Sequence, residues 1–165
     1  MSVGRFIGGV GALLWRSSDN RYLLLQRSPH KDYAQEIWEP VTGRLEQGEG
    51  FEDALYRELQ EEVGLPAQPI YILGTTHFYR GKALAENELI GVVYLCHVSG
   101  DDPPRLSAEH TQARWLSAAE ALALLTDPTP PTLWTRRVIE RAEAVRQTLP
   151  LETLLSLAQE GYELG

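Results

Sequence analysis

The sequence predicts a protein of the α/β (α+β) class, in which a mixed β-sheet is sandwiched between helices. Three observations support this class: apolar runs of strand length, longer runs with helical periodicity, and glycine- or proline-containing turns that separate them. Helix-like segments follow the strand-like runs at two places in the chain. This order is expected when helices cover both faces of a sheet.

The predicted strands are apolar runs bounded by turn-forming residues. We expect them at residues 6–15, 22–26, 38–42, 70–80, 88–98 and 113–116. The first two flank a polar turn and should form a β-hairpin. The most apolar run contains Cys96, which we interpret as a small buried hydrophobic side chain and not as a nucleophile.

The predicted helices lie at residues 50–63, 117–125, 133–148 and 151–160. Gly50 is an acceptable N-cap for the first helix, and Ser117 with Glu120 forms a capping box for the second. Pro150 separates the last two helices. Residues 1–165 are therefore expected to form a single domain, with a C-terminal helical extension from about residue 150. This extension could pack on its own domain or on the partner chain of a homodimer.

Composition and charge exclude several classes of function. The net charge of -8 and the pI near 5.0 disfavour binding to nucleic acid or to anionic membranes. No apolar stretch approaches the roughly 18 residues that a transmembrane helix needs. Cys96 is the only cysteine, which rules out a disulfide within the chain and is typical of the reducing cytoplasm. We therefore expect a cytoplasmic protein that acts on a small molecule.

The most informative segment is GRLEQGEGFEDALYRELQEEVGL, residues 43–65. A glycine is followed after five residues by a glutamate, and after seven more by an arginine that begins a run rich in glutamate. A chance match to the whole spacing in a chain of this length is rarer than roughly one in ten million. The positions that define the motif are Gly43, Glu49, Arg57, Glu58, Glu61, Glu62 and Gly64, with aliphatic Leu59 and Leu65.

The glutamates of this segment should share one face of the predicted helix. At about 100° per residue, Glu58, Glu61 and Glu62 fall within an arc of roughly 100°. Like charges at this spacing cost a few tenths of a kcal/mol per pair, so stability alone does not explain the arrangement. Mg²⁺ and Mn²⁺ prefer oxygen ligands, and Mg²⁺ commonly bridges carboxylates to phosphates. A solvated acidic helix face is the alternative, but it leaves Gly43 and Arg57 unexplained.

Arg57 is expected to organise the segment that precedes the helix. Its planar guanidinium could hold Glu49 through a two-pronged contact and so fix the preceding loop. The stripe next to the glutamates, which contains Leu55, Val63 and Tyr56, should face the hydrophobic core.

This motif is the Nudix box, so the chain resembles the Nudix hydrolases over residues 6–146. The resemblance implies the Nudix fold and cleavage of nucleoside diphosphates linked to another group, with Mg²⁺ or Mn²⁺ as cofactor. It implies that Glu58, Glu61 and Glu62 hold the metal, and that Glu58 or Glu109 accepts a proton from water. Gly43 and Glu49 are expected beside the bound substrate.

Four further candidates lie outside the box. Arg27 follows a strand at a place where many Nudix relatives have a phosphate-contacting arginine, although it could be a surface residue. The carbonyl of Thr42 corresponds to a metal ligand in relatives. Glu109 occupies a loop that often supplies another acidic ligand or base, although it could be a turn glutamate. Trp38 precedes Gly43 by five residues and could stack on a base.

Histidines and the remaining aromatic residues carry weaker signals. A single histidine without a visible partner usually packs in the interior or lies on the surface. Aromatic side chains belong more often to the core than to a binding site. The residues concerned are His30, His77, His97, His110, Phe78, Tyr79 and Trp134.

The resemblance favours a nucleoside triphosphate or a pterin triphosphate as substrate, cleaved to the monophosphate and pyrophosphate. ADP-ribose hydrolases tend to have a proline where this chain has Arg80, and dinucleoside polyphosphate hydrolases a tyrosine where it has Ala83. Both substrates remain alternatives. A non-catalytic nucleotide sensor is disfavoured because such proteins often lose box carboxylates. An isopentenyl diphosphate isomerase is disfavoured because its cysteine is missing.

Overall fold

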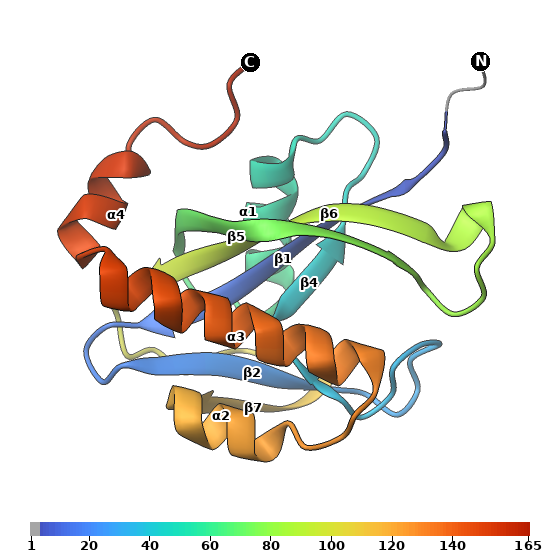
Figure 1. Ribbon diagram of the computed structural model, residues 1–165, viewed down its shortest axis with the longest axis horizontal. Helices are drawn as coiled ribbons and strands as arrows, with labels where there is room; N and C mark the ends of the chain where they lie inside the picture. Colours follow the sequence, from blue (N-terminus) through green and yellow to red (C-terminus); the bar gives the residue numbers. More distant parts are fainter. Residues whose placement is uncertain (1–3) are drawn as a thin grey trace.

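The computed structural model describes residues 4–165 and has a seven-stranded mixed sheet with helices on both faces (Figure 1). The predicted fold class is therefore confirmed. The strands are β1 (Ile7–Arg16), β2 (Arg21–Arg27), β3 (Trp38–Glu39), β4 (Val41–Arg44), β5 (Gln68–Tyr79), β6 (Glu88–Val98) and β7 (His110–Leu116). The helices are α1 (Phe51–Glu62), α2 (Ala118–Leu124), α3 (Pro130–Thr148), α4 (Leu151–Leu157) and the short 3₁₀ helix η1 (Ala85–Asn87). Within the described residues, no helix combines the length and apolar composition that crossing a membrane requires.

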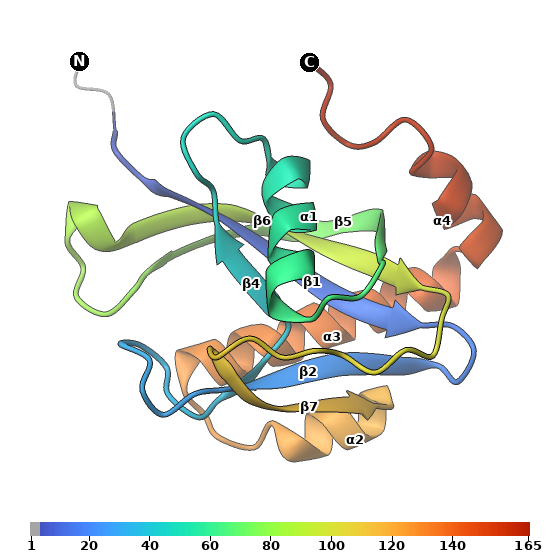
Figure 2. The ribbon, with the colours of Figure 1, turned by 180° about the vertical axis from the view of Figure 1, so that it is seen from behind.

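The central strand β1 determines where the sheet divides. On one side β1 pairs in parallel with β6 along its whole length, and β6 continues into antiparallel β5. On its other side, residues 9–12 of β1 pair with β4, whereas Trp15 and Arg16 pair with β2. Strand β2 leaves β1 beyond the hairpin and continues with β3 and β7 as a separate wing (Figure 2). The sheet therefore opens between β4 and β2.

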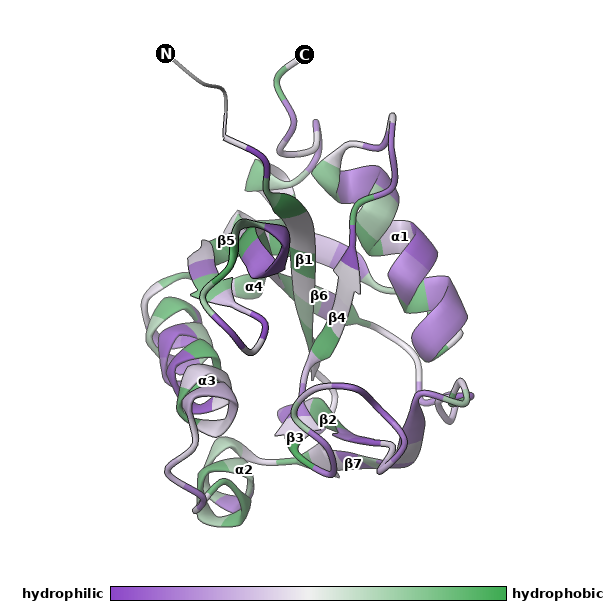
Figure 3. Ribbon diagram, turned by 90° about the vertical axis from the view of Figure 1, so that its right-hand side faces the viewer, coloured by the Kyte–Doolittle hydropathy of each residue, from purple (hydrophilic) through white to green (hydrophobic). Residues whose placement is uncertain are grey.

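The hydrophobic core has one layer on each side of β1, as its alternating side chains require. Leu13 and Trp15 face the layer covered by α2, α3 and α4, while Ala12 and Leu14 face the layer covered by α1. Figure 3 shows α1 and α3 on opposite sides of β1. Full burial of each leucine contributes about 1.5–3 kcal/mol relative to an exposed side chain. Cys96 is fully buried in the α1 layer, as predicted, and burial raises the pKa of its thiol.

Several element boundaries differ from those predicted. Helix α3 begins at Pro130 and not at residue 133, because proline is well tolerated in the first helical turn. The extended segment at residues 38–42 consists of two strands, β3 and β4, because Pro40 lacks an N–H group for a ladder hydrogen bond. Strand β7 starts three residues earlier than predicted, and α4 ends at Leu157. Tyr56 was expected in the core but is 50% exposed at the edge of the apolar stripe.

The C-terminal segment packs on its own chain and reaches α1. Leu154 of α4 is fully buried in the core layer beneath α3. Beyond α4, the Glu163 carboxylate accepts a hydrogen bond of 2.7 Å from the N–H of Phe51, while Gly50 provides no side-chain cap. An acidic group at this position satisfies an unpaired N–H and interacts favourably with the helix dipole. The tail thus supplies the side-chain acceptor that the N-cap residue Gly50 lacks.

Removing this cap should destabilise the protein. We expect Glu163→Ala to lower the free energy of unfolding by about 0.5–2 kcal/mol, the usual effect of losing an N-cap acceptor. Urea unfolding followed by circular dichroism would measure it, with Glu160→Ala, an exposed glutamate of the same tail, as control. Equal stability of both variants and the parent protein would show that the tail does not cap α1.

Candidate active site

A cleft of about 1260 Å³ lies where the sheet opens between its two wings. Its walls come from β1, β4, α1, the β5–β6 hairpin, the loop between β2 and β3, and the first turns of α3. Eight of the ten predicted site residues line it: Arg27, Thr42, Gly43, Arg57, Glu58, Glu61, Glu62 and Glu109. The two that do not are Trp38 and Glu49.

Gly43 is required by the close approach of α1 to β4. A Cβ atom at this position would overlap the carboxyl group of Glu58. Gly43 pairs with Val10 in the β1–β4 ladder, so β4 cannot easily shift to make room. The glycine of the motif therefore allows the Glu58 carboxylate to lie directly against the sheet.

The three glutamates of α1 line the cleft, but they differ in burial. Glu58 and Glu62 are 9% and 5% exposed, whereas the Glu61 side chain is 58% exposed. Burial, the main cause, and the charges of Glu62 and Glu61 raise the pKa of Glu58 above its ordinary value, although the hydrogen bond from Arg57 opposes this. Glu58 is thus the carboxylate whose proton affinity the cleft increases.

Arg57 connects α1 to the preceding loop and to β4. Its Nε and Nη2 donate hydrogen bonds of 2.7 and 2.9 Å to the two oxygens of Glu49, which is the expected two-pronged contact. Its Nη2 also donates to the Arg44 carbonyl at 2.8 Å, and its Nη1 to Glu58 at 2.8 Å and Glu61 at 3.3 Å. The hydrogen bonds from Arg57 lower the pKa of Glu49 to about 2. Glu49 therefore positions Arg57 and does not face the cleft.

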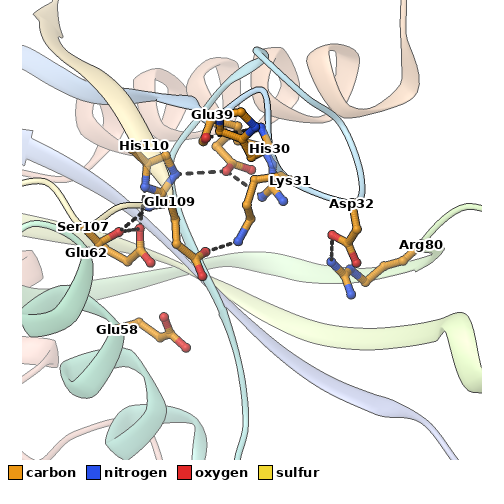
Figure 4. A network of polar contacts seen from close by, with 12 residues as sticks. His30, Lys31, Asp32, Glu39, Glu58, Glu62, Arg80, Ser107, Glu109 and His110 are labelled. Atoms are coloured by element: carbon orange, nitrogen blue, oxygen red, sulfur yellow. Dashed lines mark hydrogen bonds and ion pairs between the residues drawn. The ribbon is translucent and has the colours of Figure 1, made fainter.

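A buried chain of charges extends from Glu62 into the β2 wing (Figure 4). His110 Nδ1 lies 2.5 Å from Glu62, and its Nε2 lies 3.3 Å from Glu39. Arg27 Nη1 donates a 2.8 Å hydrogen bond to the same oxygen of Glu39. Burial would lower the pKa of His110, but hydrogen bonds to Glu39 and Glu62 and their charges outweigh this effect and raise the pKa to about 9. His110 is therefore a cation that neutralises two buried carboxylates.

Sequence reasoning missed Glu39 and His110. His110 was interpreted as a packing or surface residue, yet its side chain joins α1 to β3. One signal was available: Glu39 lies among apolar residues directly before Pro40, and a buried carboxylate needs a cationic partner. The sequence does not show which cation fills that role.

Other predicted residues lie differently from their expected places. Trp38 does not line the cleft; its ring packs against the core, with the Arg114 guanidinium 4.9 Å from the ring centroid. Neighbouring side chains of a strand point to opposite faces, and its neighbour in β3, Glu39, lines the cleft instead. Conversely, Phe78, Tyr79 and Trp134, which were interpreted as core residues, line the cleft.

Glu109 lies on the segment that leads into β7 and is held by Lys31 of the β2–β3 loop. The hydrogen bond from Lys31 is the main cause that lowers the pKa of Glu109. Glu58, Glu62 and Glu109 thus each contact a cationic side chain: Arg57, His110 and Lys31, respectively.

The donor set of the cleft suits a hard divalent cation, because seven carboxylates line it, among them Glu58, Glu61, Glu62 and Glu109, and Mg²⁺ and Mn²⁺ prefer oxygen ligands. As they stand, however, no three histidine, cysteine, aspartate or glutamate side chains among residues 4–165 converge in the manner of a metal centre. A cation would therefore have to compete with the basic partners of these carboxylates.

Comparison with known proteins identifies the class to which this fold and cleft belong. The family model for the NUDIX domain matches residues 5–139, and the chain belongs to the Nudix hydrolase family. The resemblance predicted from the box is thereby confirmed. A solved structure of the MutT protein from Methanosarcina mazei is 26% identical, with a TM-score of 0.69, and the match covers 89% of this chain and 99% of that one.

Two curated relatives match this chain over only part of their own length. An octanoyltransferase from Myxococcus xanthus is 35% identical over 136 residues, which cover 82% of this chain and 36% of that protein. An RNA pyrophosphohydrolase from Teredinibacter turnerae is 50% identical over 42 residues, which cover 26% of this chain and 25% of that protein. The match thus spans about a third of the first relative and a quarter of the second.

The geometry of Arg57 predicts that a lysine cannot replace it. Lysine has one point charge and cannot donate in parallel to both oxygens of Glu49. We expect Arg57→Lys to reduce turnover by roughly 10- to 100-fold, as is usual when groups that orient ligands are lost. Steady-state kinetics and a melting curve would check this, with Arg105→Lys, an exposed arginine outside the cleft lining, as control. Wild-type turnover in Arg57→Lys would disprove the orienting role.

Proposed function

We propose that this protein is a Mg²⁺- or Mn²⁺-dependent pyrophosphohydrolase that cleaves a nucleoside triphosphate or a pterin triphosphate to the monophosphate and pyrophosphate. One observation carries the proposal: Glu58, Glu61 and Glu62 of α1 and Glu109 of a separate segment line the same cleft. We further propose that it acts in the cytoplasm on a small molecule, in keeping with its acidic net charge.

The chain's own residues would supply binding and proton transfer. Glu58, Glu61, Glu62 and Glu109 would hold the divalent cation, and the Thr42 carbonyl is a further oxygen donor at the cleft. When bound, the cation would neutralise phosphate oxygens and lower the pKa of water. Glu58 or Glu109 would accept the proton of the attacking water.

The raised pKa of Glu58 favours it as this base, because a base works best when its pKa approaches the working pH. Glu109 has a lowered pKa while Lys31 contacts it. Glu109 would therefore become a comparable base only after it separates from Lys31.

The size and lining of the cleft support a nucleotide or a pterin derivative. Its volume exceeds the roughly 300–1,000 Å³ of typical small-molecule pockets, so it has room for a heterocycle and several phosphates. Trp134, Phe78 and Tyr79 offer aromatic surface on which a planar ring can stack. Arg44 and Arg137 line the cleft and add positive charge to it.

Glu61 allows the cleanest test, because it is the most exposed of the three glutamates and its contact with Arg57 is long, at 3.3 Å, whereas Glu58 and Glu62 are buried in close contacts. We expect Glu61→Gln to retain the fold and to lose activity by about 100-fold or more, the effect of removing a group that stabilises charge at the reacting centre. Asp53→Asn, an exposed acid on the same helix that does not line the cleft, is the matched control.

Activity would be measured as pyrophosphate and phosphate release from a panel of nucleoside triphosphates, dihydroneopterin triphosphate, ADP-ribose and a dinucleoside tetraphosphate. The panel would be run with Mg²⁺, with Mn²⁺ and with a chelator. The proposal predicts pyrophosphate from a triphosphate only when metal is present. No cleavage of any triphosphate, or a Glu61→Gln variant within threefold of the parent protein, would refute it.

A further inference from the structure

Lys31 occupies a distinctive position in the loop between β2 and β3. This loop lines the cleft, and within it Lys31 contacts the carboxylate of Glu109 (Figure 4). The side chain of Lys31 is 23% exposed, and that of Glu109 is 52% exposed. The contact therefore joins two walls of the cleft at a place that solvent and small molecules can reach.

The loop is anchored on both sides of Lys31. On one side, the N–H of Ser28 donates a 2.8 Å hydrogen bond to the Glu109 carbonyl, so the backbones of the two segments are joined. On the other side, Arg80 of the β5–β6 hairpin lies 3.5 Å from the carboxylate of Asp32 and 5.9 Å from the ring centroid of Tyr33. These contacts hold Lys31 over the cleft even if its own side chain changes partner.

The Lys31–Glu109 pair is easier to separate than the other two pairs of cation and carboxylate. Arg57 makes contacts with Glu49 and the Arg44 carbonyl besides the one with Glu58, and His110 is buried between two carboxylates. Lys31 has a flexible four-carbon stem and a single point charge. Because the pair is partly exposed, solvent screens its charges and little is lost when they separate.

We propose that Lys31 is a phosphate-binding residue that exchanges partners: it holds Glu109 in the free protein and moves to a substrate phosphate when Glu109 turns to the divalent cation. This inference rests on the proposed function, since it uses Glu109 as a ligand of the cation. Lys31 thereby exchanges one anionic partner for another, and its charge stays compensated in both states. The ammonium group suits this role because it can donate to a phosphate from several directions.

The exchange predicts two effects of opposite sign. Without nucleotide, Lys31 competes with the cation for Glu109, so its removal should strengthen metal binding. With nucleotide, Lys31 contributes a charge-assisted hydrogen bond to phosphate, so its removal should weaken nucleotide binding. Removal of a residue with a merely structural role would weaken both metal binding and nucleotide binding, or neither of them.

The test compares Lys31→Met, which keeps most of the stem but removes the charge, with Lys31→Arg and Lys82→Met. Lys82 is the other lysine of the chain and lies exposed in the β5–β6 hairpin outside the cleft lining. Mn²⁺ binding without nucleotide would be measured by electron paramagnetic resonance. Calorimetry with α,β-methylene ATP in excess Mn²⁺ would measure nucleotide binding, and melting curves would confirm folding.

For Lys31→Met we expect Mn²⁺ to bind roughly twofold to fivefold more tightly and the ATP analogue about 10-fold or more weakly. Lys31→Arg should restore nucleotide affinity, and Lys82→Met should match the parent protein. Unchanged or weaker Mn²⁺ binding in Lys31→Met overturns the exchange, and so does unchanged affinity for the analogue. If the parent protein cleaves no triphosphate, the proposed function fails, but the Mn²⁺ comparison still tests whether Lys31 competes for Glu109.

Discussion

The guanidinium of Arg57 is the contact on which the rest of the cleft depends. It joins three segments that the sheet alone would not hold together: α1, the loop that contains Glu49, and the backbone of β4 at Arg44. The carboxylate of Glu58 can then lie against Gly43, where any side chain would displace it. The arginine, the two glutamates and the glycine of the motif thus serve one geometric purpose, which is to fix the carboxylate face of α1 against the sheet.

Compensation of charge explains how such an acidic cleft can be stable. Burial of an unpaired carboxylate is costly, and here Arg57 and His110 neutralise the two buried glutamates of α1. Glu61 and Glu109 are mostly exposed and need less compensation. The buried pairs are rigid and positioned by several contacts, while the exposed carboxylates have freedom to move. The buried pairs therefore position the side chains inside the cleft, while the exposed carboxylates at its edge can change their contacts.

The sequence predicted what local spacing determines. The helix of the box, its N-cap at Gly50, the pairing of Arg57 with Glu49 and the fold class follow from residues close together in the chain. Pairings between distant segments could not be predicted, because one sequence does not show which cation meets which carboxylate. His110 is therefore the main omission. Trp38 shows a second limit: a strand of two residues has too little alternation to reveal which face is buried.

Calorimetric melting of four samples tests the central claim, that the carboxylates of α1 hold a cation which bridges to phosphate. The samples are the protein alone, with Mg²⁺, with nucleoside triphosphate, and with both. Because ligands that bind the folded state stabilise it by mass action, the account predicts that metal alone raises the melting temperature and that both together raise it by more than the sum of the separate effects. Equal stabilisation by the nucleotide with and without Mg²⁺ would contradict the account, since the phosphates would then bind independently of the carboxylates.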